Sequence, residues 1–201
     1  MVLVGPWETM IIFSIFLNMQ FRKYTCSNRF VTLSAGLAFV KPKHPIASAI
    51  KQAELLLEES KGGGKNMITL FGTTVEWEKL PVLIDFFLFL DKKMNDNDSE
   101  INTSFLHRLL RYHHMALSYL DGRKIEGLKY LSSLSYDMGR NIVKWGKDKE
   151  IQKGHEEFLF LQKLINEKPN TDSLIYNLKV PLFWALYRNR RIPRGEFISP
   201  F

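Results

Sequence analysis

The chain has 201 residues, 45% of them hydrophobic and 24% charged, and this composition excludes a disordered tail or a fibrous repeat. Its single cysteine, Cys26, excludes an intramolecular disulfide and favours the cytoplasm over secretion. The formal net charge is +7, and the whole excess lies in residues 101–201, since residues 1–100 carry 11 basic and 11 acidic side chains. A basic half favours an anionic partner such as nucleic acid, although an ordinary soluble surface accounts for the charge equally well.

The first apolar segment, residues 10–21, predicts a helix in the core. It is shorter than the roughly 18 to 20 apolar residues that a membrane-spanning helix needs. Asn18 and Gln20 interrupt it, and no basic residue precedes it as in a signal peptide. We therefore expect no membrane anchor here.

Residues 31–40 alternate in the manner of a strand with two unlike faces. One face is mostly bulky and is expected to pack on helices. The other is small and partly polar, so that a ligand could approach the backbone closely. The bulky face consists of Val31, Leu33, Ala35, Leu37 and Phe39, and the small face of Thr32, Ser34, Gly36 and Ala38.

The remaining pattern predicts an α+β fold in two domains. A helix over 46–61 ends at three glycines and is followed by a strand over 67–71 and an apolar helix over 79–90. The polar, turn-rich stretch 94–100 marks a boundary between a domain over 1–95 and an all-α domain over 100–201. The second domain is predicted to contain helices at 103–120, 124–145, 149–167 and 172–190, the last kinked or restarted at Pro181.

Common catalytic and metal-binding patterns are not found. His107, His113 and His114 lack the i, i+4 spacing that would let two of them share a cation on one helix face. No serine stands in a Gly-x-Ser-x-Gly elbow. The run Gly62–Lys65 lacks the preceding strand and the following Ser/Thr-led helix of a Walker loop.

One constellation in the first half suits a nucleotide. Lys61 and Lys65 flank the glycine run, directly after the helix that follows the strand carrying Ser34 and Gly36. Two ammonium groups beside a glycine-rich bend could hold a triphosphate, while a flat base approaches the small face of the strand. A flexible helix-to-strand connector is the alternative explanation.

A second constellation, in the basic half, suits RNA or single-stranded nucleic acid, because basic and aromatic residues are interleaved there. The alternative is that the aromatic residues belong to the core and that the last arginines complement a helix C-terminus. The basic residues are Arg108, Arg111, Arg140, Lys144, Lys147, Arg188, Arg190, Arg191 and Arg194, and the aromatic ones are Tyr112, Tyr136, Trp145, Trp184 and Tyr187.

The chain also resembles a known family over nearly its whole length. Leu-Val-Gly-Pro-Trp at 3–7, Thr-Leu-Ser-Ala-Gly-Leu-Ala-Phe-Val-Lys-Pro-Lys-His-Pro-Ile at 32–46, Ala53-Glu54, Lys61, Lys65-Asn66 and Ile68-Thr-Leu-Phe-Gly72 resemble the second palm domain of the large subunit of type III-A (Csm) CRISPR effector complexes. Ser104-Phe-Leu, Arg108-Leu-Leu, Tyr136, Arg140-Asn-Ile, Asn177-Leu-Lys-Val-Pro-Leu and Ala185-Leu-Tyr-Arg-Asn-Arg190 resemble its C-terminal helical domain.

The resemblance implies a partial ferredoxin-like, cyclase-related palm that binds ATP, followed by a helical bundle. In that family a Gly-Gly-Asp-Asp hairpin holds Mg²⁺ or Mn²⁺ to make cyclic oligoadenylates when target RNA is bound, and an HD domain cuts single-stranded DNA. Neither motif occurs in these 201 residues, so the chain alone is predicted to be inactive. A palm without the hairpin is also expected to expose strand edges and part of its core.

By the same resemblance, each constellation acquires a role. Ser34 and Gly36 are expected to line the adenine, and Lys61 and Lys65 to lie near the phosphates. Arg188, Arg190 and Arg191 are expected to contact RNA, in a bundle that faces guide RNA, target RNA and the small subunits of the complex.

Two other functions stay open. One is a stand-alone, non-enzymatic RNA-binding or scaffold protein of a CRISPR complex. The other is a degenerate regulator of the diguanylate-cyclase type, which accounts for the strand and for Lys61 and Lys65 but not for the resemblance of the second half.

Overall fold

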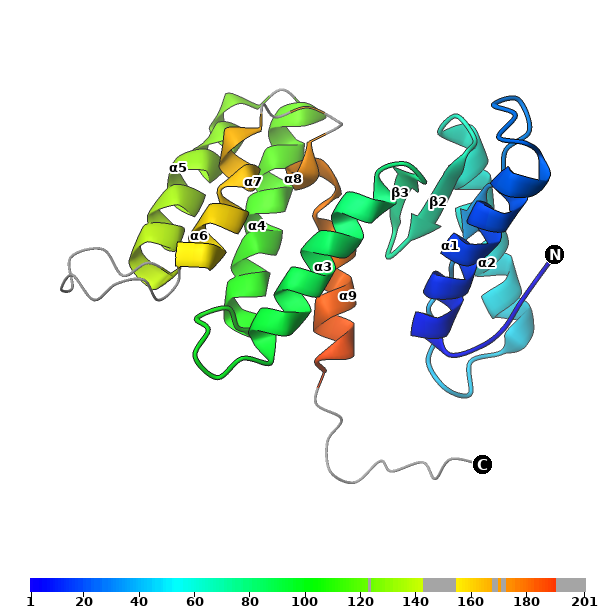
Figure 1. Ribbon diagram of the computed structural model, residues 1–201, viewed down its shortest axis with the longest axis horizontal. Helices are drawn as coiled ribbons and strands as arrows, with labels where there is room; N and C mark the ends of the chain where they lie inside the picture. Colours follow the sequence, from blue (N-terminus) through cyan, green and yellow to red (C-terminus); the bar gives the residue numbers. More distant parts are fainter. Residues whose placement is uncertain (123, 143–154, 168–169, 171–172, 191–201) are drawn as a thin grey trace. The chain divides into compact units, whose positions relative to one another are not determined.

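The computed structural model describes residues 1–122, 124–142, 155–167, 170 and 173–190 (Figure 1). The chain divides into two compact units, Met1–Val82 and Leu83–Phe201. The first unit combines α1 (Trp7–Tyr24) and α2 (Ile46–Gly62) with the strands β1 (Ala35–Gly36), β2 (Met67–Leu70) and β3 (Thr73–Glu76). The second unit is helical in its described residues, so the predicted α+β fold is confirmed.

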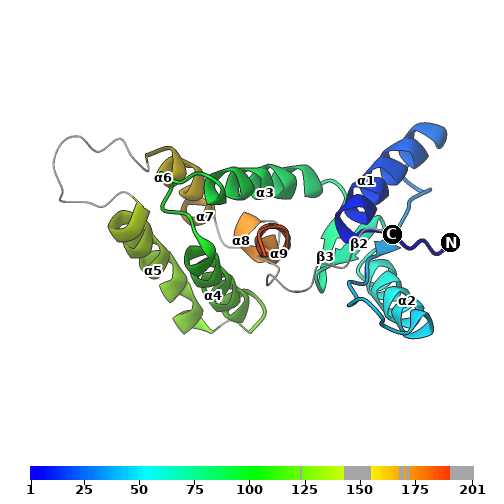
Figure 2. The same ribbon diagram turned by 90° about the horizontal axis from the view of Figure 1, so that it is seen from below.

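The sheet of the first unit has the order β1-β2-β3. β1 and β2 are parallel, with Ala35 paired to Ile68, and α2 forms the crossover between them. β2 and β3 are antiparallel and joined by Phe71 and Gly72, which both have positive φ, as a two-residue hairpin requires. Figure 2 shows α1 and α2 on opposite sides of β2 and β3.

The strand predicted over 31–40 is much shorter in the structure. Only Ala35 and Gly36 form the ladder, which one further bond extends, from the Leu37 amide to the Thr69 carbonyl at 2.9 Å. The reason is that β1 lies at the edge of the sheet and its neighbour β2 has only four residues before the chain reverses. The sequence analysis also missed β3, although Gly72 followed by the β-branched Thr73, Thr74 and Val75 is a hairpin signal.

The expectation that residues 10–21 form a core helix is wrong with respect to burial. α1 forms over this segment, but only Ile11 and Asn18 of its residues are buried. Its large apolar side chains Ile12, Phe13, Phe16 and Met19 are 37–58% exposed. None of the described helices is long and apolar enough to cross a membrane.

The second unit contains α4 (Thr103–Leu120), the 3₁₀ turn η1 (Ile125–Leu128), α5 (Lys129–Asp137), the π-helical turn η2 (Met138–Ile142), α6 (His155–Leu161), α7 (Lys163–Asn166), α8 (Leu174–Asn177) and α9 (Lys179–Arg188). α4 begins where the Asn102 side chain accepts a hydrogen bond from the Phe105 amide at 3.0 Å. The last predicted helix restarts as expected, because Pro181 stands in the first turn of α9, where an amide donor has no helical partner.

α3 (Leu80–Met94) crosses the division between the two units. Phe86 and Phe87, which belong to the second unit, are 1–2% exposed. The Phe87 ring stacks on Trp184 of α9, with centroids 4.4 Å apart, and the Phe86 ring lies 5.3 Å from Phe160 of α6. In Figure 2, α9 is seen end-on between α3 and α4. The division at Val82 therefore lies earlier than the boundary predicted at 95–100, and the domain assignment stays a prediction.

Candidate functional site

One candidate site lies at the amino ends of β1 and β2. Ser34 precedes β1 by one residue and Lys65 precedes β2 by two, and because these strands are parallel both residues lie at the same end of the sheet. Lys61 is in the last turn of α2 and reaches the same connection. Three of the four residues assigned to nucleotide binding are thus brought to one α2–β2 turn and the strand beside it.

The two lysines of this turn differ in their surroundings. Lys61 Nζ pairs with Glu58 Oε1 at 2.7 Å, so part of its charge is balanced on its own helix. Lys65 is exposed, has φ of +63°, and forms no ion pair with any of the described residues. Such a backbone conformation is uncommon outside glycine and worth a functional explanation. Lys65 is therefore the cation available to an anionic ligand.

Gly36 is small because α2 packs against it. A Cβ built on Gly36 would lie 2.3 Å from the Leu57 amide nitrogen and 2.7 Å from the Ala53 carbonyl oxygen. The space on this face at Gly36 is therefore filled by helix backbone and is not open to a base. The role of Gly36 in nucleotide binding stays a prediction. The close packing of α2 by itself explains why this position has no side chain.

A chain of buried hydroxyl groups fixes α2 on the sheet. Ser60 Oγ donates to the Ala35 carbonyl at 2.6 Å and lies 2.7 Å from Thr69 Oγ1, which is 2.8 Å from Thr74 Oγ1. These bonds join the helix to all three strands. They hold the α2–β2 turn, and with it Lys65, in a defined place.

Trp77 belongs to the same end of the sheet and was missed by the sequence analysis. Its indole Nε1 donates to the Leu33 carbonyl at 2.8 Å, and the residue is 5% exposed. Its amide donates to the Asn66 carbonyl. Trp77 thereby ties the segment before β1 to the turn before β2. The available signal was a tryptophan between the predicted strand over 67–71 and the predicted helix over 79–90.

Metal binding has no candidate group among the described residues, which contain no cluster of three His, Cys, Asp or Glu side chains able to hold an ion. The carboxylates of Asp85 and Asp91 lie in α3, and those of Asp96 and Asp98 follow it. One of them, Asp91, is engaged by Asn189 Nδ2 at 2.9 Å. Any metal for the family chemistry would need ligands beyond these.

Two of the predicted RNA-binding arginines lie at the end of α9: Arg188 is its last residue, and Arg190 follows two residues later. Arg188 Nε is 3.6 Å from Asp91 Oδ2, and its guanidinium lies over the Phe87 ring at 5.6 Å, so this side chain ties α9 to α3. Arg190 is exposed. Arg191 lies outside the described residues. Trp184 is 3% exposed, so it belongs to the core, as the alternative explanation held, and cannot stack on a base.

A different group of basic residues lines a cleft of about 550 Å³ beside α4 and α5. It contains Arg108, Arg111 and Arg140, together with the buried carboxylate of Asp137 and the 64% exposed ring of Tyr136. These arginines belong to the second constellation of the sequence, but the pattern gave no sign that α4 and α5 would bring them together.

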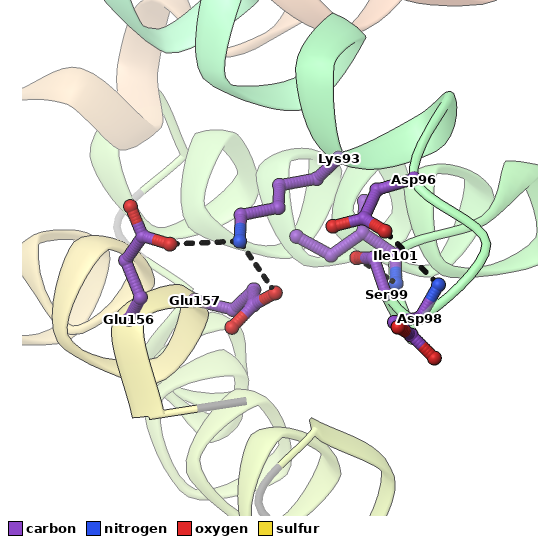
Figure 3. Close-up of polar contacts among 7 residues, drawn as sticks. All are labelled: Lys93, Asp96, Asp98, Ser99, Ile101, Glu156 and Glu157. Atoms are coloured by element: carbon purple, nitrogen blue, oxygen red, sulfur yellow. Dashed lines mark hydrogen bonds and ion pairs between the residues drawn. The ribbon is translucent and has the colours of Figure 1, made fainter. Parts of the chain in front are cut away.

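A buried lysine links α3 to α6. Lys93 is 7% exposed, and its Nζ donates to Glu156 Oε2 at 2.8 Å and lies 2.9 Å from Glu157 Oε1 (Figure 3). The bond to Glu156 raises the pKa of Lys93 and lowers the pKa of Glu156. Both groups therefore stay charged near neutral pH, and the cluster is a structural tie between helices.

His113 is a second buried polar side chain and connects α4 to α8. Its Nδ1 lies 2.8 Å from the Ile175 carbonyl, and the residue is 1% exposed. Burial lowers the pKa of His113 to about 4. It is therefore neutral at pH 7 and donates its Nδ1 proton to the carbonyl. It belongs to the core, whereas the spacing of the histidines predicted surface or contact positions.

Comparisons with known proteins agree with the resemblance seen in the sequence. Residues 1–69 match a family model described as Cas10/Cmr2, second palm domain. Proteins named CRISPR system single-strand-specific deoxyribonuclease Cas10/Csm1 (subtype III-A) are similar over longer stretches. That of Enterococcus italicus is 27% identical over 155 residues, which cover 74% of this chain and 20% of the relative.

Two further proteins of the same name match shorter stretches. That of Methanocaldococcus jannaschii is 31% identical over 88 residues, or 38% of this chain and 11% of the relative. That of Streptococcus thermophilus is 30% identical over 105 residues, or 52% of this chain and 13% of the relative. The chain therefore spans about a fifth or less of the length of these curated relatives.

Proposed function

We propose that the chain works as part of a type III-A CRISPR effector complex, because it is similar to part of the large subunit Cas10/Csm1 of such systems. In this proposal the complex acts in antiviral defence in the cytoplasm. The whole subunit binds ATP, makes cyclic oligoadenylate and cuts single-stranded DNA when target RNA is recognised. This chain contributes part of the ATP pocket and a helical unit that faces RNA and the small subunits.

The observation that carries the proposal is the match of residues 1–69 to a second palm domain. The matched stretch contains Ser34, Gly36, Lys61 and Lys65. Ser34 and Lys65 lie at one end of the sheet, and the hydrogen-bonded hydroxyl groups of Ser60 and Thr69 fix the α2–β2 turn there. A preformed turn with an unpaired ammonium group supports triphosphate binding, because little side-chain entropy is lost apart from that of the lysine itself.

Within the site, this chain's residues bind and orient the nucleotide. Lys65 neutralises a phosphate. Lys61 provides a second cation when its ion pair with Glu58 breaks. Ser34 contacts the nucleoside beside β1. Mg²⁺ or Mn²⁺ supplies charge neutralisation of the phosphates when bound, and its ligands come from residues other than those described here.

A fluorescent ATP analogue titrated against the full chain, with unlabelled ATP as competitor, tests the pocket. We expect the double substitution Lys61→Gln/Lys65→Gln to weaken binding about a hundredfold or more, since each of the two charge-assisted contacts contributes about 1.5–3 kcal/mol. Lys51→Gln, an exposed lysine of the same helix, is the matched control and should bind as the wild type. Equal binding by the double variant contradicts the assignment of the two lysines.

The scaffold function is the second candidate, and the cleft with three arginines in the second unit favours it. It predicts that the chain binds RNA or other subunits with no detectable affinity for ATP. The same titration therefore separates the two functions: competition by ATP supports the palm pocket, and its complete absence supports the scaffold.

A further inference from the structure

The cleft beside α4 and α5 carries more positive charge than its own carboxylate balances. Asp137 is 4% exposed and is held by Arg108 Nε at 2.7 Å, Tyr112 OH at 2.9 Å and the Asn141 side-chain amide. Its acceptor oxygens are thus occupied from inside the protein. Arg108 is committed to this pair, which leaves the other two arginines of the cleft for an external anion.

Arg111 and Arg140 form no ion pair with any described residue, and both are exposed at the cleft. Each of the two guanidinium groups contacts a tyrosine. Arg111 lies over the Tyr112 ring at 5.5 Å, and Arg140 lies over the Tyr136 ring at 6.0 Å while its NH1 donates to Tyr136 OH at 3.0 Å. Rings under the guanidinium groups hold them in place and leave most of their N–H donors unused.

The π-helical turn η2 gives these side chains their position. It follows α5 directly and contains Arg140 and Asn141, so the wider turn changes the direction of both relative to a continuous α-helix. Asn141 contacts Asp137 and Arg140 contacts Tyr136, each four residues earlier in the chain, a spacing at which side chains also meet on an α-helix. Such turns are rare and are frequently found at functional sites.

We propose that this cleft binds single-stranded RNA, with Arg111 and Arg140 contacting a backbone phosphate and a base stacking on Tyr136. The guanidinium groups of Arg111 and Arg140, which form no ion pair with a described residue, suit the oxygens and the negative charge of a phosphodiester. The Tyr136 ring is 64% exposed at the edge of the cleft, and an exposed ring beside cations suits a base better than an acidic peptide. This inference rests on the proposed function in that it names RNA as the anion, but it assigns binding to α4 and α5 instead of the end of α9.

The test is fluorescence anisotropy of a fluorescein-labelled ten-nucleotide oligouridylate with the full chain over a salt series. We expect Arg111→Gln/Arg140→Gln to weaken binding at least tenfold and to reduce the salt slope by about 0.7, the value for one neutralised single-strand phosphate. The control Lys124→Gln/Lys129→Gln removes the same charge from two exposed positions, one directly before η1 and one at the start of α5. It should keep most of the affinity, and equal losses in the two variants overturn the cleft as a site.

A second pair of variants tests the base. Tyr136→Ala should lose about tenfold in affinity, whereas Tyr136→Phe, which keeps the ring, should lose little. Equal loss in both overturns stacking on this ring. The melting temperature of each variant is measured, and affinities are compared only among variants that melt at the same temperature as the wild type. Loss of fold is then not counted as loss of binding.

Three outcomes separate this inference from the proposed function. If Arg188→Ala/Arg190→Ala/Arg191→Ala abolishes RNA binding and the cleft variant does not, the cleft is overturned while the RNA-facing role stands. If decaglutamate displaces the RNA and itself binds the wild type but not the cleft variant, the cleft belongs to an acidic protein partner and the inference is overturned. If the wild-type chain binds no RNA, both the cleft and the RNA-facing role fail, and ATP binding remains a separate question.

Discussion

The packing of α3 on α9 predicts that Phe87→Ala strongly destabilises the helical unit. Phe87 is 2% exposed and stacks on Trp184 with an angle of 19° between the rings. Removing a buried phenylalanine costs about 3–5 kcal/mol, of which about 0.5–1.5 kcal/mol reflects the ring pair itself. For a chain of this size that loss lowers the melting temperature by roughly 6–20 °C.

Urea unfolding followed by far-ultraviolet circular dichroism measures the change, since most of the helical signal comes from this unit. The matched control is Leu88→Ala in the next position of α3, because Leu88 is 52% exposed and its loss should change the unfolding free energy by no more than about 0.5 kcal/mol. If the two variants have the same midpoint, α3 does not pack on α9 as the stacked rings indicate.

The same packing decides where the helical unit begins. A fragment over 100–201 lacks Leu83, Phe86, Phe87 and Leu90, which are 0–3% exposed. Burial of four such side chains contributes roughly 6–12 kcal/mol, which is comparable with the whole stability of a domain. We therefore expect a fragment over 83–201 to melt cooperatively and a fragment over 100–201 to lose that cooperativity. A cooperative melt of the shorter fragment supports the boundary predicted from the sequence instead.

Three further predictions concern single features of the chain. Gly36→Ala should lower the unfolding free energy by about 1–3 kcal/mol, because the new methyl group meets the α2 backbone at 2.3 Å. Gly62→Ala is the control and should cost nothing, since no atom lies within 4 Å of its new methyl group. Thermal melts compare the two variants, and a Gly36→Ala variant as stable as the wild type contradicts the close packing. The pKa of His113 is lowered from its ordinary 6.5 to about 4, so the unfolded chain takes up the proton first and the folded state loses stability as the pH falls through this range. Between pH 7 and about pH 4 the unfolding free energy of the wild type, measured by urea titration, should fall by about 3 kcal/mol more than that of His113→Leu. If the unfolding free energies of the two proteins change in parallel with pH, the prediction is wrong. Purified chain incubated with ATP and Mg²⁺ or Mn²⁺ should make no cyclic oligoadenylate by chromatography, since no Gly-Gly-Asp-Asp is present; product that disappears on Lys61→Ala means that the active site was misplaced.

The sequence predicted the elements with strong periodicity and missed those that depend on tertiary pairing. The helices α2 and α4 begin and end within a few residues of the predicted ranges, because glycines and the Asn102 cap mark their ends. The length of β1 could not be predicted, since it depends on how far β2 runs beside it. The exposure of α1 could not be predicted either, because an apolar pattern does not show whether another part of the protein packs against the helix.

For the candidate site, the residue types were easier to predict than their geometry. The sequence singled out Lys61 and Lys65, and the parallel pairing of β1 and β2 brings Lys65 to the end of the sheet where Ser34 lies. It could not show that α2 fills the space at Gly36, which depends on the distance between helix and strand. Nor could it predict the arginine cleft, because the turn η2 interrupts a segment that reads as one continuous helix.

The most direct test of the account is whether this chain joins a type III-A effector complex. The chain is mixed with guide RNA and the other effector subunits from the same organism, and the assembly is measured by size-exclusion chromatography and native mass spectrometry. The account predicts co-elution and a complex that is heavier by 23.5 kDa for each copy bound. Elution of the chain as free protein, with and without guide RNA, contradicts it.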